Sequence, residues 1–189
     1  MNTAVKKGKL IVISAPSGCG KTTIVKRLLE RNQNLTRSIS YTTRAPREGE
    51  ENGRDYFFIS EDEFSSKERN GFFIESAKVF GQSYGTSRGT VLGELTNGRS
   101  VILAIDVQGM KQLCAKAKNE IPVVSIFVMP PSLTALRTRL RKRKTETEKE
   151  IERRLKIAQD EMAERSNYDF VIVNREVDQA VKEIEAIVK

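Results

Sequence analysis

The stretch LIVISAPSGCGKTT, residues 10–23, decides the fold of this 189-residue chain. It begins with a run of apolar, mostly β-branched residues, which is typical of a buried strand. Residues 15–22 then match the phosphate-binding pattern G-x-x-x-x-G-K-[ST] at every defined position except the first, where Ala15 stands. Residues 22–32 follow with apolar side chains at helical spacing. The stretch therefore predicts a strand, a phosphate-binding loop and a helix in direct succession.

Each defined position of this loop has a physical task. Gly18 and Gly20 allow backbone N–H groups to turn toward phosphate oxygens, which requires positive φ or close approach. Lys21 supplies a point charge for the β- and γ-phosphates, and the Thr22 hydroxyl can ligate magnesium. The helix that begins at Lys21 directs its positive end toward the same anion. Ala15 lies where the strand leaves the sheet, where alanine is acceptable at negative φ, so we expect the loop to bind a nucleoside triphosphate.

Further strand and helix signals alternate along the chain. Residues 101–106, 123–129 and 169–174 form apolar runs of the type found in buried parallel strands, and residues 177–189 close the chain as an amphipathic helix. Strands separated by helical segments predict a parallel sheet with helices on both faces. The expected fold class is therefore α/β, with a parallel sheet of the type found in P-loop nucleoside triphosphatases.

Two segments interrupt this alternation. Residues 37–89 are rich in Ser, Thr, Tyr, Phe and Gly, and their short alternating runs predict a small inserted α/β subdomain with short antiparallel strands. Residues 132–165 predict two charged helices, with a turn in which Thr145 and Glu148 are spaced as a capping box. Their apolar stripes are Leu133, Leu136 and Leu140, and Ile151, Leu155, Ala158 and Met162. The predicted parts are a core of residues 1–38, 90–131 and 162–189, an inserted subdomain of residues 39–89, and a helical lid of residues 132–161.

The composition excludes several kinds of chemistry and of partner. The chain has no histidine and only two cysteines, which excludes Ser-His and Cys-His nucleophiles and offers no pattern for a metal site or a disulfide framework. The formal net charge is +8, but six positive charges lie within residues 137–144 with no aromatic residues among them, so we expect no nucleic-acid partner. No apolar run approaches the roughly 20 residues of a membrane span, and no signal-peptide pattern is present. We expect a cytoplasmic protein with no membrane partner, and both a monomer and a small homo-oligomer stay open.

The inserted subdomain carries the residues that discriminate among phosphate-binding proteins. Residues 40–58 read SYTTRAPREGEENGRDYFF, and FIESA (73–77) and GQSYGTS (81–87) follow. Arg44 and Arg47 are three apart with a proline between them, which makes a rigid pair suited to forked contact with one phosphate.

These motifs, together with the phosphate-binding loop, resemble those of the guanylate kinase family. TETE (145–148), RRL (153–155) and VIVN (171–174) extend the resemblance to nearly the whole chain, from about residue 9 to residue 188. The resemblance implies ATP-dependent phosphorylation of GMP, and of dGMP as well, by in-line transfer, in purine nucleotide recycling. It also implies that ATP and GMP are the small-molecule substrates and that Mg²⁺ accompanies ATP.

By this resemblance the inserted subdomain binds GMP. The implied residues are Arg44, Arg47, Tyr56 and Tyr84 for the phosphate, and Ser40, Glu75 and Thr86 for the guanine. The carboxylate of Glu75 can accept from two adjacent guanine donors, N1–H and the exocyclic N2–H, whereas adenine presents an acceptor at N1. Sites that hydrogen-bond their substrate in this way can reject analogues by ~10⁴–10⁵-fold. Asp106, at the end of the strand predicted over 101–106, either contacts guanine or holds a magnesium-bound water, and both alternatives stay open.

The same resemblance implies the ATP-binding and catalytic residues. The implied ATP-binding residues are Ala15, Pro16, Ser17, Gly18, Cys19, Gly20, Lys21, Thr22, Thr23, Arg139 and Asn174. The implied catalytic residues are Lys21, Arg47, Arg143 and Arg154, with Thr22 as the metal ligand. Phosphoryl transfer needs alignment, neutralised charge and excluded water, so a histidine-free chain rich in arginine suits it. Because the acceptor subdomain and the lid are separate insertions, we expect both to close over the substrates.

Three positions depart from the family pattern, and two other functions remain as alternatives. Ala15 replaces the usual first glycine, Ala104 stands where an acidic residue is common, and Arg175 stands where an aspartate is common. One alternative is a guanylate-kinase-like module that binds without catalysis, but such copies typically lose the phosphate-binding loop that this chain keeps. The other is a kinase for a different nucleoside monophosphate, and Ser40 with Glu75 argues for guanine instead.

Overall fold

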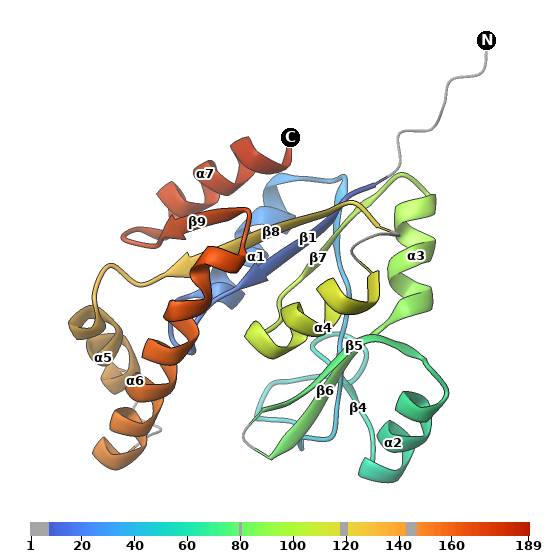
Figure 1. Ribbon diagram of the computed structural model, residues 1–189, viewed down its shortest axis with the longest axis horizontal. Coiled ribbons are helices and arrows are strands. Elements are labelled where there is room, and N and C mark those ends of the chain that lie inside the picture. Colours follow the sequence, from blue (N-terminus) through green and yellow to red (C-terminus); the bar gives the residue numbers. More distant parts are fainter. Residues whose placement is uncertain (1–7, 80, 118–120, 143–146) are drawn as a thin grey trace. The chain divides into compact units, whose positions relative to one another are not determined.

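The computed structural model describes residues 8–79, 81–117, 121–142 and 147–189, whose strands form two sheets (Figure 1). Five parallel strands follow the order β2-β7-β1-β8-β9, and a mixed sheet of four strands follows the order β4-β3-β6-β5. The strands are β1 (Leu10–Ser14), β2 (Leu35–Arg37), β3 (Tyr41–Thr42), β4 (Phe57–Phe58), β5 (Phe73–Val79), β6 (Gln82–Ser87), β7 (Ser100–Leu103), β8 (Val123–Met129) and β9 (Phe170–Val173). The expected α/β class with a parallel sheet is confirmed.

Helices connect most of these strands. They are α1 (Lys21–Arg31), α2 (Glu61–Arg69), α3 (Arg88–Thr96), α4 (Val107–Ala117), α5 (Leu133–Lys142), α6 (Glu148–Ala163), the short 3₁₀-helix η1 (Glu164–Asn167) and α7 (Val177–Val188). In the described part of the chain, none of them combines the length and the apolar composition that crossing a membrane would require.

Two compact units make up the chain. The first comprises the described residues of Met1–Leu10, Asn34–Leu103 and Gln108–Val123, and the second comprises those of Ile11–Gln33, Ala104–Val107 and Val124–Lys189. The first unit therefore contains the whole four-stranded sheet, and the second contains the phosphate-binding loop. The division into a core, an inserted subdomain and a lid stays a prediction.

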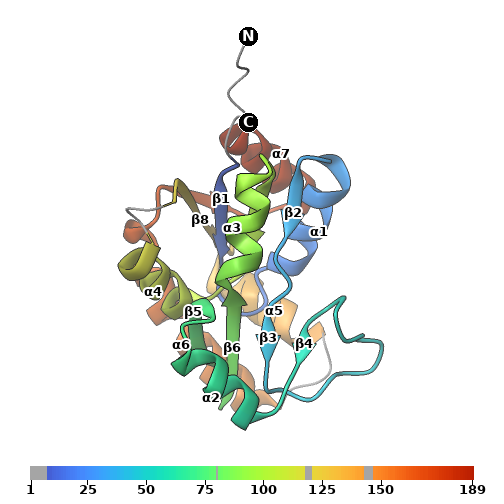
Figure 2. The ribbon, with the colours of Figure 1, turned by 90° about the vertical axis from the view of Figure 1, so that its right-hand side faces the viewer.

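The four-stranded sheet of the first unit is mixed rather than antiparallel. β6 pairs antiparallel with both β3 and β5, as expected, but β3 and β4 run parallel. The reason is that residues 43–56 separate β3 from β4, a connection much longer than the 2–5 residues of a hairpin. Stacked rings fill the inner side of this sheet, with Tyr41 against Phe57 at 4.7 Å between centroids and Phe64 against Phe73 at 4.6 Å. Helices α2 and α3 both pack against β5 (Figure 2).

The second unit contains β1, the phosphate-binding loop and the helix α1 that follows it. β1 is buried throughout, and α1 buries Ile24, Val25 and Leu28, the face that the sequence predicts. On its other side α1 packs against α7, where Asp178 accepts hydrogen bonds from Arg27 at 3.2 Å and from Arg31 at 2.8 Å. This packing fixes the direction of α1 and thus of its N-terminus.

Two strand predictions need correction. The strand predicted over 101–106 ends at Leu103, so Asp106 lies beyond it, because the ladder with β2 ends where Arg37 pairs with Ile102. β9 is not a buried strand: Ile172 alone among its four residues is buried, and the others are 39–42% exposed. β9 lies at the edge of the sheet with β8 as its neighbour. An apolar run by itself does not distinguish an edge strand from a central one.

The two helices predicted over 132–165 are α5 and α6, which pack side by side (Figure 1). Their buried side chains are Leu136, Leu140, Ile151, Leu155 and Ala158, while Leu133 and Met162 are half-buried. The predicted capping box is wrong by two positions, because α6 begins at Glu148 with Thr147 as its N-cap. Glu150 Oε2 accepts from the N–H of Thr147 at 2.7 Å, and the Thr147 hydroxyl accepts from the N–H of Glu150 at 3.4 Å. Thr145 lies outside the described residues.

Candidate active site

The phosphate-binding loop of the second unit has the backbone that its glycines predict. Gly18 and Gly20 adopt φ angles of 94° and 86°, in the left-handed region that strains residues with a Cβ atom. Gly20 is the N-cap of α1, and no described side chain caps this helix. The first turn of α1 presents its backbone N–H groups at the positive end of the helix, which is where helices bind anions. Ala15 is 5% exposed, which agrees with its expected place at the exit of β1.

Asn174 braces the loop from a distant part of the chain. Its Nδ2 donates to the carbonyl of Cys19 at 2.7 Å, and a Cβ atom on Gly20 would lie 2.8 Å from the same nitrogen. Arg139 in turn donates from Nη2 to the carbonyl of Asn174 at 2.8 Å. Asn174 is 1% exposed, so its hydrogen bond to Cys19 is buried, whereas the bond from Arg139 is part-buried. The two predicted ATP-binding residues outside the loop thus hold the loop in shape.

Arg154 is the predicted catalytic residue of the lid that the structure describes. Its Nη1 donates to the hydroxyl of Ser17 at 2.8 Å, which brings the guanidinium from the middle of α6 to the phosphate-binding loop. Arg143, the other predicted lid arginine, lies outside the described residues. The role of Arg154 toward the phosphates of ATP stays a prediction.

Lys21 lies close to two carboxylates of the second unit. Its Nζ donates to the carbonyl of Ile105 at 3.1 Å, next to Asp106. Glu161, near the end of α6, has its pKa raised to about 7, because burial disfavours the charged form and Asp106 adds to this effect, while Lys21 opposes it. A carboxyl of α6 near Lys21 therefore changes charge near neutral pH.

In the first unit, Arg44 and Glu50 form a half-buried ion pair. Nη2 of Arg44 donates to both carboxylate oxygens of Glu50, at 2.9 and 3.0 Å, and the backbone N–H of Arg47 donates to Glu50 at 2.8 Å. Burial acts to raise the pKa of Glu50, but the hydrogen bonds from Arg47 and Arg44 outweigh it and lower the pKa. Burial acts to lower the pKa of Arg44, but its bonds to Glu50 and Tyr84 raise it. Both groups stay charged, and the Arg44 guanidinium is held in one place.

Aromatic rings surround this guanidinium. Tyr56 and Tyr84 lie edge to face with 6.0 Å between their centroids, and Cζ of Arg44 is 5.4 Å from the centroid of Tyr56. Cζ of Arg37, the last residue of β2, lies 5.9 Å from the same centroid. Burial raises the pKa of Tyr56, so its hydroxyl remains a hydrogen-bond donor. The structure thus gathers Arg44, Tyr56 and Tyr84, while the side chain of Arg47 is exposed.

The predicted base-reading carboxylate is buried and oriented. Glu75 and Thr86 are 3% and 0% exposed and lie opposite each other in the β5–β6 ladder. The Thr86 hydroxyl donates to Oε1 of Glu75 at 2.5 Å. Burying a carboxylate is costly unless hydrogen bonds compensate it, so this glutamate is not an ordinary strand residue facing solvent. Ser40 is half-buried just before β3, and its carbonyl accepts from the N–H of Phe57 at 2.9 Å.

Comparison with known proteins identifies the family of this chain. The family model described as guanylate kinase matches residues 7–189. A guanylate kinase of Wolbachia pipientis wMel is 47% identical over 185 residues, which are 98% of this chain and 91% of the relative. The chain belongs to the guanylate kinase family.

Two further guanylate kinases support this assignment. One from Caldanaerobacter subterraneus subsp. tengcongensis is 48% identical over 184 residues, 97% of this chain and 87% of the relative. The crystal structure of a guanylate kinase from Anaplasma phagocytophilum is 38% identical with a TM-score of 0.80, and the match covers 97% of this chain and 85% of that chain. The resemblance that the motifs indicated is confirmed.

Sequence reasoning missed three residues that the structure places beside the candidate site residues. Glu50 lies inside the acceptor motif, and its signal is a glutamate that follows two arginines within a few residues. Glu161 borders the apolar stripe of α6, one turn from Ala158, and a carboxyl at the edge of a buried face is the signal that could have revealed it. Arg37 precedes the motif and offers no local signal, because only the fold brings it to Tyr56.

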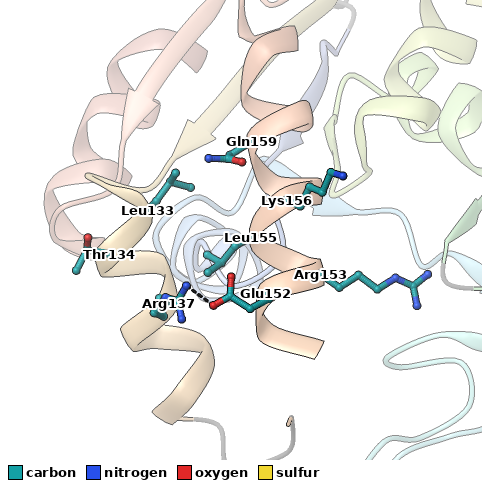
Figure 3. Close-up of a pocket in the computed structure, with 8 residues that line it drawn as sticks. All are labelled: Leu133, Thr134, Arg137, Glu152, Arg153, Leu155, Lys156 and Gln159. Carbon is teal, nitrogen blue, oxygen red and sulfur yellow. Dashed lines mark ion pairs between the residues drawn. The ribbon is translucent and has the colours of Figure 1, made fainter. Parts of the chain in front are cut away.

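A pocket of about 730 Å³ lies elsewhere, between α5 and α6, and includes none of the predicted site residues (Figure 3). Leu133 and Leu155 lie between the two helices in this view, and Arg137 points toward Glu152, with which it forms an ion pair. Arg153 extends away from the other lining residues. This pocket is therefore separate from the residues that the sequence predicts for ATP and GMP.

Proposed function

We propose that this chain transfers the γ-phosphoryl group of ATP to the phosphate of GMP, giving GDP and ADP. The observation that carries this proposal is the buried Glu75–Thr86 pair, in the same unit as the Arg44–Glu50 pair and Tyr84. The Glu75–Thr86 pair can accept hydrogen bonds from the N1–H and N2–H of guanine, and the Arg44–Glu50 pair can receive a phosphate. Groups suited to a base and to a phosphate within one unit match a nucleoside monophosphate with guanine as its base.

The donor half of the proposal rests on the phosphate-binding loop and on the N-terminus of α1, which begins at Lys21 with Gly20 as its N-cap. Gly18 and Gly20 shape the loop, Lys21 brings its charge to it, and Arg154 reaches it through Ser17. These groups stabilise the charge of the transferring phosphoryl group, together with Arg47 and Arg143 in the proposed mechanism. Attack by a GMP phosphate oxygen in line with the leaving ADP requires no protein nucleophile.

Mg²⁺ accompanies ATP in this proposal, and the donor atoms at the loop suit it. The hydroxyl of Thr22 lies in the first turn of α1, and Asp106 supplies a carboxylate near Lys21 and Glu161. Mg²⁺ prefers oxygen ligands and keeps several waters beside one or two carboxylates and substrate phosphates. When bound, it would neutralise the charge of the β- and γ-phosphates. Asp106 belongs to the second unit, which also contains the phosphate-binding loop. This supports a role for Asp106 toward a magnesium-bound water over contact with guanine.

The two alternative functions lack a comparable support. A binding module without catalysis would need neither the left-handed glycines at the loop nor an arginine held against Ser17. A kinase for AMP would place adenine N1, an acceptor, against the buried carboxylate of Glu75. The cytoplasmic location, and a monomeric or small homo-oligomeric state, stay predictions from the sequence.

A coupled ATP assay with GMP, dGMP, AMP, CMP and UMP tests the proposal. We expect turnover with GMP and dGMP, and kcat/KM for AMP lower by at least about a thousandfold, since one buried carboxylate is left facing an acceptor. Glu75→Gln is expected to abolish this preference, and Glu63→Gln, at an exposed position on α2, serves as the matched control. Binding of GMP without turnover would favour the non-catalytic module, and activity with AMP alone would refute the assignment.

A further inference from the structure

The strand that carries Glu75 is anchored on its other side by contacts that phosphoryl transfer does not use. Ser76, the next residue of β5, is 5% exposed. Its backbone N–H donates to Oε1 of Gln112 at 3.2 Å, and its hydroxyl lies 3.4 Å from the same oxygen. The hydroxyl donates to Oε1 of Glu68 at 2.6 Å. Ser76 therefore joins β5 to α4 and α2, and Ser76, Gln112 and Glu68 all belong to the first unit.

The ladder alone constrains this part of β5 poorly. β5 is an edge strand of its sheet, so no strand of the described residues pairs with the N–H groups on its outer side. The register with β6 also shifts between Phe73 and Glu75, which marks a bulge immediately before the carboxylate. A bulge disrupts the ladder locally and redirects the side chain that follows it. An external anchor at Ser76 supplies the constraint that the bulge removes.

Movement of this anchor is transmitted to the carboxylate through one peptide unit. Successive side chains of a strand point to opposite faces, so Glu75 faces Thr86 while Ser76 faces Gln112 and Glu68. Rotation of the peptide between the two residues turns both side chains. A carboxylate that accepts two parallel N–H groups tolerates little rotation, because hydrogen bonds weaken steeply away from linear geometry.

We propose that Gln112 and Ser76 are positioning residues for guanine recognition, which act by holding the Glu75 carboxylate in the plane of the base. The proposal rests on the proposed function and deepens it, since it locates part of the specificity in a helix that acts through Ser76. Hypoxanthine lacks the exocyclic N2–H of guanine. Discrimination between GMP and IMP therefore reports the second hydrogen bond of the carboxylate, which is the bond most sensitive to its orientation.

Four variants separate positioning from general stability. Gln112→Met removes the acceptor at nearly constant size, and Ser76→Ala removes the hydroxyl. Ser76→Thr retains the hydroxyl, and a pocket of about 300 Å³ lined by Ser76 has room for its methyl group. Gln108→Met is the control, because Gln108 is an exposed glutamine of the same helix.

The readouts are GMP and IMP affinity by calorimetry without ATP, and kcat and KM for GMP, IMP and ATP. For Gln112→Met and Ser76→Ala we expect Kd and KM for GMP to rise about 3- to 10-fold, the effect of one lost hydrogen bond. The GMP-to-IMP preference should fall by a similar factor, while kcat and the KM for ATP stay within about twofold. Ser76→Thr and Gln108→Met should behave as the wild type.

Two results would overturn the positioning role. One is an unchanged GMP-to-IMP ratio in both Gln112→Met and Ser76→Ala. The other is a parallel loss for GMP, IMP and ATP that follows a fall in Tm, because this would indicate a role in stability alone. A wild-type chain that binds GMP without phosphorylating it would refute the proposed function, and the calorimetric GMP-to-IMP ratio of the variants would still decide the positioning role.

Discussion

Replacement of Glu161 by glutamine is expected to make stability less dependent on pH. Burial raises the pKa of this carboxyl from its ordinary 4.5 to about 7, with Lys21 opposing the rise and Asp106 adding to it. Between these two values the folded chain keeps a proton that the unfolded chain has lost. The contribution of Glu161 to stability is therefore fully present below pH 4.5 and is lost as the pH rises through 7.

The magnitude follows from the two pKa values. At about 1.36 kcal/mol per pH unit they differ by about 3.4 kcal/mol, of which about 2.5 kcal/mol falls between pH 5 and pH 8. Glu161 is only partly buried, and solvent screening reduces this to about 1–2 kcal/mol. Glutamine has nearly the same size and does not ionise. Relative to the wild type, Glu161→Gln should therefore gain about 1–2 kcal/mol at pH 8 beyond any difference at pH 5.

Urea denaturation at pH 5 and pH 8, at constant ionic strength, measures this difference. Asp160→Asn provides the control, because Asp160 is the exposed neighbour of Glu161 on α6. We expect the control to follow the pH dependence of the wild type. If Glu161→Gln differs from the wild type by the same free energy at both pH values, or if Asp160→Asn shows an equal gain, the argument from burial is refuted.

Three further variants test the loop and the lid. Gly20→Ala should weaken ATP binding by at least about tenfold, because it strains a φ of 86° and brings a Cβ atom within 2.8 Å of Nδ2 of Asn174. Calorimetry measures this loss of affinity. Gly93→Ala is the control, because a Cβ atom on Gly93 meets nothing within 4 Å. Arg154→Met should lower kcat by at least about a hundredfold with little change in Kd for GMP. A fall in GMP affinity with normal turnover of the bound complex would contradict the proposed role of Arg154 at the phosphates of ATP. Thr147→Ala should destabilise the chain by about 1 kcal/mol through loss of the N-cap of α6, measurable as a lower urea midpoint.

Features that depend on neighbouring residues were predictable from the sequence. The loop functions through contiguous glycines and Lys21, so its pattern predicts both its backbone and the start of α1. The apolar face of α1 follows from helical spacing for the same reason. The capping box shows the limit of such patterns, since two Thr-x-x-Glu spacings overlap within residues 145–150, and only the observed start of α6 selects the second.

Features that depend on distant residues required the fold. The edge position of β9 leaves three of its apolar residues exposed, although their composition is that of a buried strand. The raised pKa of Glu161 depends on burial and on Asp106, which is far away in the sequence. The anchoring of Ser76 depends on Gln112, a residue with no motif of its own.

The sequence by itself therefore determined the fold class and the family, and it predicted the groups for ATP and GMP, because motifs record which chemical groups are present and in what order. The tertiary structure alone decided how those groups are held. It showed that Asn174 and Arg139 brace the loop, that Glu50 fixes Arg44, and that Thr86 orients Glu75. The physical reason is that burial and hydrogen bonding depend on distance in space, which the order of residues along the chain does not specify.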